Sequence, residues 1–249
     1  MAKKEYKVVK KRNLFNKFLK GLIRIFKTKP SIVNLNNEPL IDKAIYVSNH
    51  SGASGPMTYE MFFPKRMTPW GAHEMCGNYK SRWKYLYHVF YRQKMHWGKA
   101  KAFIIATLFA IISKLLYNSV GLIGTYHDTR LLKTMRDSTK VLDENMPLLI
   151  FPEDSTLGYL EPPESFNKGY LTMSKLYYKL RKVDLPIYPM YYSKKKALFV
   201  VGEPIYYNKL IEEGFDEDQI NNQVLDAVTR LYFEHVQVCS DVKQIEETK

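Results

Sequence analysis

Short apolar runs alternate with longer amphipathic stretches along the chain. Short runs bounded by polar or proline-marked turns predict buried strands, whereas longer stretches with apolar residues at helical spacing predict helices. The predicted strands include residues 43–47, 147–152 and 185–189, and the predicted helices include residues 57–63, 130–145, 170–182 and 216–237. This mixture favours an α/β fold over an all-helical or all-β fold.

The most apolar stretch covers residues 102–123. It is uncharged from residue 102 to residue 113 and is then interrupted by Lys114. About twenty predominantly apolar residues are needed to span a bilayer. We therefore expect a helix that is buried or that dips into a membrane, rather than one that crosses it.

Basic residues are concentrated at the start of the chain. The formal net charge of the 249 residues is +13. Eleven Lys and Arg residues and one Glu lie within the first thirty residues, so this segment alone carries +10. A segment with such a local charge is expected to contact a polyanion, either an anionic lipid surface or a nucleic acid.

Residues 13–28 separate into two faces on a helix with about 100° per residue. One narrow stripe is basic and the broad opposite side is apolar. The stripe comprises Lys17, Lys20, Arg24 and Lys27, and the apolar side comprises Leu14, Phe15, Phe18, Leu19, Leu22, Ile25 and Phe26. This pattern predicts a helix lying in an anionic membrane surface, and the alternative is a helix docked on the protein's own core. No nucleic-acid partner is expected, because a nucleic-acid-binding arm would not need so broad an apolar face.

The length of the chain limits the number of domains, and its cysteines indicate the cellular compartment. A chain of this size can bury one full core, so we expect a single domain over residues 31–240, preceded by the basic segment 1–30 and followed by a polar tail over residues 241–249. Cys76 and Cys239 are far apart and lack metal-ligand spacing, which indicates a reducing, cytosol-facing compartment and no metal site. No signal peptide is expected, since the N-terminus lacks an early apolar region followed by a small-residue cleavage site.

Residues that could carry out chemistry stand at or after the predicted strands, in a fixed order along the chain. Asn49-His50 follows the first strand, Glu153 follows Phe151-Pro152 at the end of the second, and Pro186-Ile187-Tyr188-Pro189 lies in the third. Phe166, Lys168 and Gly169 stand between the last two, and Gly202-Glu203-Pro204-Ile205 closes the series. In this order, over about residues 44–205, the motifs resemble those of glycerolipid acyltransferases of the lysophosphatidate type.

The resemblance implies a single α/β domain with a mixed central sheet flanked by helices. It implies transfer of a fatty acyl group from acyl-CoA or acyl carrier protein, as co-substrate, to the hydroxyl of a lipid resembling a lysophospholipid, without an acyl-enzyme and without a bound cofactor. His50 is then the general base, which suits imidazole because it titrates near neutral pH. The substrate-binding residues implied are Asn49, Glu153, Ser155 and Lys168.

Two motifs depart from the family pattern. Gly55 stands where the first motif has an aspartate that orients the histidine, and Asp154-Ser155-Thr156 stands where the third motif has Gly-Thr-Arg. We expect another carboxylate to orient His50, and the candidates are Glu60, Glu74 and Asp154. The second motif lacks an arginine at its expected place, the nearest being Arg130. Because arginine is the usual bidentate partner of phosphate, these departures speak against a simple glycerol phosphate acceptor.

Three readings of function therefore stay open. The first is an acyltransferase bound peripherally to the cytosolic face of an anionic membrane. The second is a catalytically weakened relative that binds lipid or acyl carrier protein, which the missing aspartate favours. The third is a hydrolase that uses the same pocket on thioesters or lipids.

Overall fold

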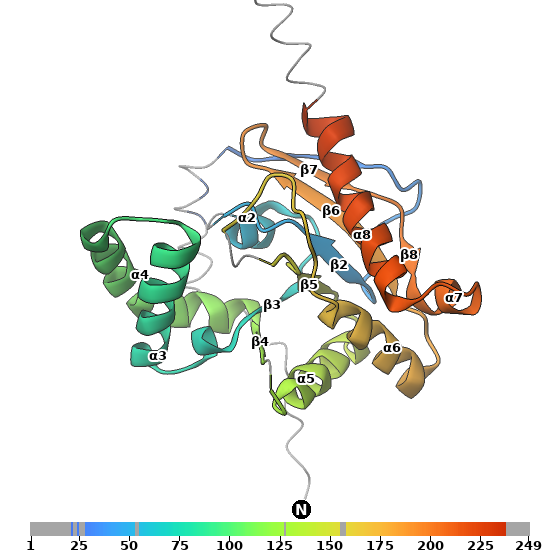
Figure 1. Ribbon diagram of the computed structural model, residues 1–249, viewed down its shortest axis with the longest axis horizontal. Helices are drawn as coiled ribbons and strands as arrows, with labels where there is room; N and C mark the ends of the chain where they lie inside the picture. Colours follow the sequence, from blue (N-terminus) through green and yellow to red (C-terminus); the bar gives the residue numbers. More distant parts are fainter. Residues whose placement is uncertain are drawn as a thin grey trace, which may run out of the picture.

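The computed structural model describes residues 28–52, 55–126, 128–154 and 158–237, together with Gly21 and Arg24 (Figure 1). Most of the predicted basic helix, the polar tail and Ser155 lie outside the described residues. Of the residues expected to bind the membrane, Arg24 is described, and its guanidinium donates to the Met61 carbonyl and lies 5.7 Å from the centre of the Phe62 ring.

The centre of the molecule is a mixed, mostly parallel eight-stranded sheet, which confirms the α/β prediction. The strand order is β1-β7-β6-β2-β5-β3-β4, and β8 pairs with β6. The strands are β1 (Ser31–Asn34), β2 (Ile45–Ser48), β3 (Thr68–Ala72), β4 (Ile123–Thr125), β5 (Leu148–Ile150), β6 (Pro186–Ser193), β7 (Leu198–Val201) and β8 (Ile205–Tyr206). Only the pairs β6–β7 and β6–β8 among these strands are antiparallel.

The two faces of the sheet pack on different helices, because successive side chains of a strand point to opposite sides. In β2, Ile45 and Val47 join the larger core, which α5 (Leu131–Asp143), α6 (Gly169–Arg181) and α8 (Glu217–Tyr232) cover. Tyr46 joins a second core beneath α2 (Gly55–Phe62). Three shorter described helices are α7 (Tyr207–Glu212) and η3 (Phe233–Gln237), near α8, and η1 (His73–Cys76), directly after β3.

A separate helical lobe lies beyond the β3–β4 end of the sheet (Figure 1). It comprises α3 (Tyr79–Lys84), η2 (Tyr85–Lys94), which is a π-helix, and α4 (Lys99–Val120). Small residues of α4 pack against Leu86 and Tyr91 in a third core. The sequence analysis predicted the helix in the apolar stretch, but it did not predict α3 or η2, whose aromatic and basic residues lack a clear apolar stripe.

Candidate functional site

Four neighbouring parallel strands, β2, β5, β3 and β4, end at the same edge of the sheet. Ligands of open α/β sheets bind outside the carboxyl ends of the strands. A pocket of about 1070 Å³ opens at this edge, between the sheet and the helical lobe. Its polar and charged lining includes His50, Glu60, His73, Glu74, Lys94, Asp128, Glu153, Asp154, Tyr159 and Lys168.

His50 stands in the turn after β2, and a backbone carbonyl fixes its ring. The distance from its Nδ1 to the Gly52 carbonyl oxygen is 2.6 Å. Because a carbonyl can only accept, Nδ1 carries the proton and Nε2 keeps a lone pair. The ring stacks on Tyr159 with centroids 4.3 Å apart and meets the edge of Phe151 at 5.1 Å. Burial of the ring lowers the pKa of His50 to about 4. The hydrogen bond to Gly52 raises this pKa, and the charge of Lys94 lowers it by a smaller amount.

Glu153 connects the first and third motifs. The backbone N–H of His50 donates to its Oε1 at 2.7 Å. Burial raises the pKa of Glu153 to about 7, although this hydrogen bond and the charge of Lys94 act in the opposite direction. The two motif residues thus share one wall of the pocket, with a neutral imidazole beside a carboxyl that titrates near neutral pH.

Gly55 lies tightly against the backbone of His50. A Cβ atom at Gly55 would lie 1.9 Å from the carbonyl oxygen of His50 and 2.9 Å from its carbon. Real Cβ atoms do not approach backbone so closely, so no side chain fits at this position without moving the turn. The start of α2 packs directly on the backbone of His50, and the carbonyl of Gly52 occupies the position where an orienting carboxylate was expected.

The three candidate orienting carboxylates all line the pocket but have other surroundings. Glu74 lies 3.3 Å from Nδ1 of His73. Asp154 is exposed, and its charge acts on Lys94. Glu60 lies on α2, one turn after Gly55. In the hydrogen bond described for Nδ1 of His50 the acceptor is the Gly52 carbonyl. The assignment of an orienting carboxylate stays a prediction.

Two of the predicted substrate-binding residues have structural partners instead. Asn49 is buried, and its amide exchanges hydrogen bonds with the backbone of Tyr192 at 3.0 and 2.7 Å, which ties the end of β2 to β6. Lys168 lines the pocket, but its Nζ lies 2.5 Å from a carboxylate oxygen of Asp218. Asn49 therefore holds the turn that carries His50, and Lys168 forms an exposed ion pair with Asp218.

Tyr159 and Lys94 were missed by the sequence analysis. Nζ of Lys94 lies 5.7 Å from the centre of the Tyr159 ring, the same ring that stacks on His50. Burial lowers the pKa of Lys94, and the carboxylates of Asp154, Glu153 and Glu74 partly restore it. No sequence signal marks Lys94, because it reaches the pocket from the end of η2, far from the motifs in the chain.

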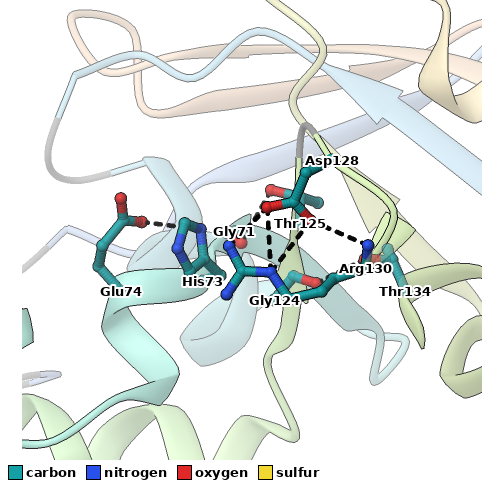
Figure 2. Close-up of polar contacts among 8 residues, drawn as sticks. All are labelled: Gly71, His73, Glu74, Gly124, Thr125, Asp128, Arg130 and Thr134. Carbon is teal, nitrogen blue, oxygen red and sulfur yellow. Dashed lines mark hydrogen bonds and ion pairs between the residues drawn. The ribbon is translucent and has the colours of Figure 1, made fainter. Parts of the chain in front are cut away.

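A second polar cluster lies at the ends of β3 and β4, on the rim of the pocket (Figure 2). Arg130 donates to Asp128 through Nε at 3.0 Å and Nη2 at 2.7 Å, and its guanidinium lies over the Tyr126 ring. These hydrogen bonds from Arg130 lower the pKa of Asp128 to about 2. Hydrogen bonds from Thr125 to the Gly71 carbonyl and from Thr134 to the Gly124 carbonyl join the surrounding elements. The arginine nearest to the second motif is thus engaged in an ion pair.

The described site offers a neutral imidazole acceptor and a carboxyl close to it, in a pocket large enough for a lipid-sized ligand. Its walls include apolar side chains from the helical lobe, among them Leu86, Val89 and Phe109. Such a site can take a proton from a hydroxyl and exclude water from the reacting atoms. No family model, curated protein or solved structure matches the chain.

Proposed function

We propose that the protein is an acyltransferase that moves a fatty acyl group from acyl-CoA or acyl carrier protein to the hydroxyl of a lipid. The observation that carries the proposal is the junction of the first and third motifs at the pocket. His50 points its Nδ1 at Gly52 while its own N–H binds Glu153, 103 residues later in the chain. The order of the motifs along the sequence, which resembles the glycerolipid acyltransferases, supports the same reaction.

In this reaction Nε2 of His50 accepts the proton of the lipid hydroxyl as its oxygen attacks the thioester carbonyl. The new oxygen–carbon bond forms, the carbon–sulfur bond breaks, and the proton goes on to the leaving thiolate. A base that is neutral at pH 7 is competent for the first step. Glu153, as the resemblance implies, would hold the acceptor end of the substrate.

The orientation of His50 by a carbonyl has a kinetic consequence. A carboxylate partner both fixes the tautomer and stabilises the imidazolium that forms in the transition state. A neutral carbonyl fixes the tautomer but stabilises the charge less. We therefore expect a slower reaction than a carboxylate-assisted site would give.

The test is product analysis with acyl-CoA or acylated carrier protein as donor and a panel of lysolipids as acceptors. We expect an acylated acceptor from the wild type and a loss of at least about 100-fold in His50→Ala, as for removal of a general base. Glu60→Gln, Glu74→Gln and Asp154→Asn serve as matched pocket variants and are expected to keep most of the activity. Wild-type turnover in His50→Ala would contradict the proposal.

The second candidate function is lipid or acyl-carrier binding without turnover. The observation that favours it is the carbonyl of Gly52 in place of a carboxylate beside His50. Binding of lysolipid or acylated carrier without any acylated product would establish this function. Release of free fatty acid would instead identify the hydrolase that the same pocket could support.

A further inference from the structure

Helix α4 turns its large side chains outward and its small ones inward. Its buried side carries Ala102, Ala106, Ala110 and Ser113, whereas Phe103, Ile104, Leu108, Ile111, Ile112 and Leu115 are between 42% and 60% exposed. On a helix with about 100° per residue these six residues occupy one continuous side. A contiguous exposed apolar patch of this kind marks an interaction site.

Helix α4 is long and apolar enough to cross a membrane, by length and composition alone. The helix, however, is hydrogen-bonded to the rest of the lobe. The buried guanidinium of Arg82 donates to the Ala110 carbonyl at 3.1 and 3.2 Å, and the Trp83 indole donates to Thr107 at 3.0 Å. These hydrogen bonds and the apolar contacts of the lobe favour a helix that lies along a surface over one that leaves its partners to cross the bilayer.

The charge of the helical lobe indicates which kind of surface α4 would bind. Between residues 75 and 126 the sequence contains no Asp or Glu. It contains eight basic residues over the same range, namely Lys80, Arg82, Lys84, Arg92, Lys94, Lys99, Lys101 and Lys114. Of these, Lys80, Lys84, Lys99, Lys101 and Lys114 are exposed. Basic residues around an apolar helix face are typical of binding to anionic lipid.

Aromatic residues of the lobe fit the same surface. The Trp83 ring stacks on Tyr87 and meets the edge of Phe103, which belongs to the exposed side of α4. Nζ of Lys101 lies 4.1 Å from the centre of the Trp97 ring. Tryptophan and tyrosine concentrate at membrane–water interfaces because their rings are amphipathic.

The same helix also borders the pocket. Phe109, Leu116, Tyr117 and Val120 of α4 belong to the pocket lining. A lipid chain that leaves a bilayer beneath α4 would therefore meet apolar side chains of this helix on the way to His50. Helix α4 lies in the helical lobe at one side of the molecule (Figure 1), and it contributes both the exposed face and part of the pocket lining.

We propose that the exposed face of α4, with the basic residues of its lobe, docks the protein on an anionic membrane surface. The occupant is the interfacial region of an anionic leaflet, with the six apolar side chains in the acyl boundary and the lysines at the lipid phosphates. The inference deepens the proposed function, because it supplies a lipid source next to the pocket. It does not depend on turnover, since docking is measured by binding alone.

The test is co-sedimentation of the full chain with vesicles of phosphatidylcholine alone or with added phosphatidylglycerol. The variant Ile104→Gln/Leu108→Gln/Ile111→Gln is expected to bind the anionic vesicles at least about tenfold more weakly than the wild type, because three inserted side chains are lost. The matched control, Leu132→Gln/Leu180→Gln/Ile211→Gln, changes three exposed apolar residues on other helices and is expected to bind like the wild type. A second variant, Lys101→Glu/Lys114→Glu, is expected to lose the preference for anionic vesicles.

Equal vesicle binding by the wild type and the α4 variant would overturn the proposal, as would an equal loss in the control. Light scattering without vesicles gives one further outcome. If the wild type is a dimer, the α4 variant is a monomer and both bind vesicles equally, the exposed face is a contact between two copies. This result would also overturn the docking proposal. Failure of acyl transfer with intact α4-dependent binding would refute the proposed function alone.

Discussion

Gly55 lies so close to His50 that a Cβ atom at position 55 would stand 1.9 Å from the His50 carbonyl oxygen. Gly55→Asp, which places an aspartate where the acyltransferase motif that the sequence resembles has one, is therefore expected to lower the proposed activity rather than to raise it. Gly55→Ala should cost about 1–3 kcal/mol of stability through overpacking. Thermal unfolding measures the loss, and Gly98→Ala is the control, because a Cβ at Gly98 meets nothing within 4 Å. An unchanged melting temperature in Gly55→Ala would show that the turn accommodates a side chain.

Glu153 predicts a pH dependence of stability. Its pKa is raised from 4.5 to about 7 in the folded protein, so its contribution to stability is complete below about pH 4.5 and is lost as the pH rises through about 7. We expect the wild-type melting temperature to fall between about pH 4.5 and pH 7 by an amount that Glu153→Gln removes. The exposed control Glu144→Gln should keep the wild-type slope. The same slope in Glu153→Gln would refute the assignment.

The lowered pKa of His50 gives a stability contribution with the opposite pH dependence. Its pKa is lowered from 6.5 to about 4, so its contribution is present above about pH 6.5 and is lost as the pH falls through about 4. Lys94→Gln removes a positive charge that lowers this pKa further. We expect the pKa of His50, followed by NMR titration of the imidazole, to rise in Lys94→Gln and to stay unchanged in the exposed variant Lys99→Gln. An unchanged titration in Lys94→Gln would mean that Lys94 does not act on His50.

The ion pairs of Arg130 and Lys168 lead to a prediction about the acceptor lipid. Arg130 is paired with Asp128 and Lys168 with Asp218, so a phosphate would have to compete with a carboxylate for either side chain. We expect at most about a threefold preference for phosphate-bearing over phosphate-free lysolipids with one acyl donor, well below the contribution of a bidentate arginine. Strong selectivity for the glycerol phosphate acceptor, lost in Arg130→Gln or Lys168→Gln, would show that substrate displaces one of these ion pairs.

The basic N-terminal segment predicts a second contribution to membrane binding. Deleting residues 1–29 removes ten of the thirteen net positive charges and is expected to weaken binding to anionic vesicles, mainly at low salt. Combining the deletion with the α4 variant should abolish the remaining binding. Full binding by the truncated protein would assign docking to the α4 face alone.

The sequence by itself determined the α/β class and the positions of its main elements. The apolar runs before Asn49 and Glu153 form β2 and β5, and the amphipathic stretch 216–237 forms α8, which begins with the capping box of Asp216 and Gln219. These features are local, because side-chain spacing and capping act over a few residues. His50 and Glu153 became candidates through the resemblance of their motifs to the acyltransferases and not through these local signals.

Tertiary structure decided which atoms meet at the site. The Gly52 carbonyl accepts the hydrogen bond from Nδ1 of His50, and the start of α2 lies against the His50 backbone. Lys94 reaches the pocket from the helical lobe, which is inserted between β3 and β4. Asn49 is hydrogen-bonded to the backbone of Tyr192 in β6. Such contacts depend on how distant segments pack, and neither periodicity nor motif spacing contains that information.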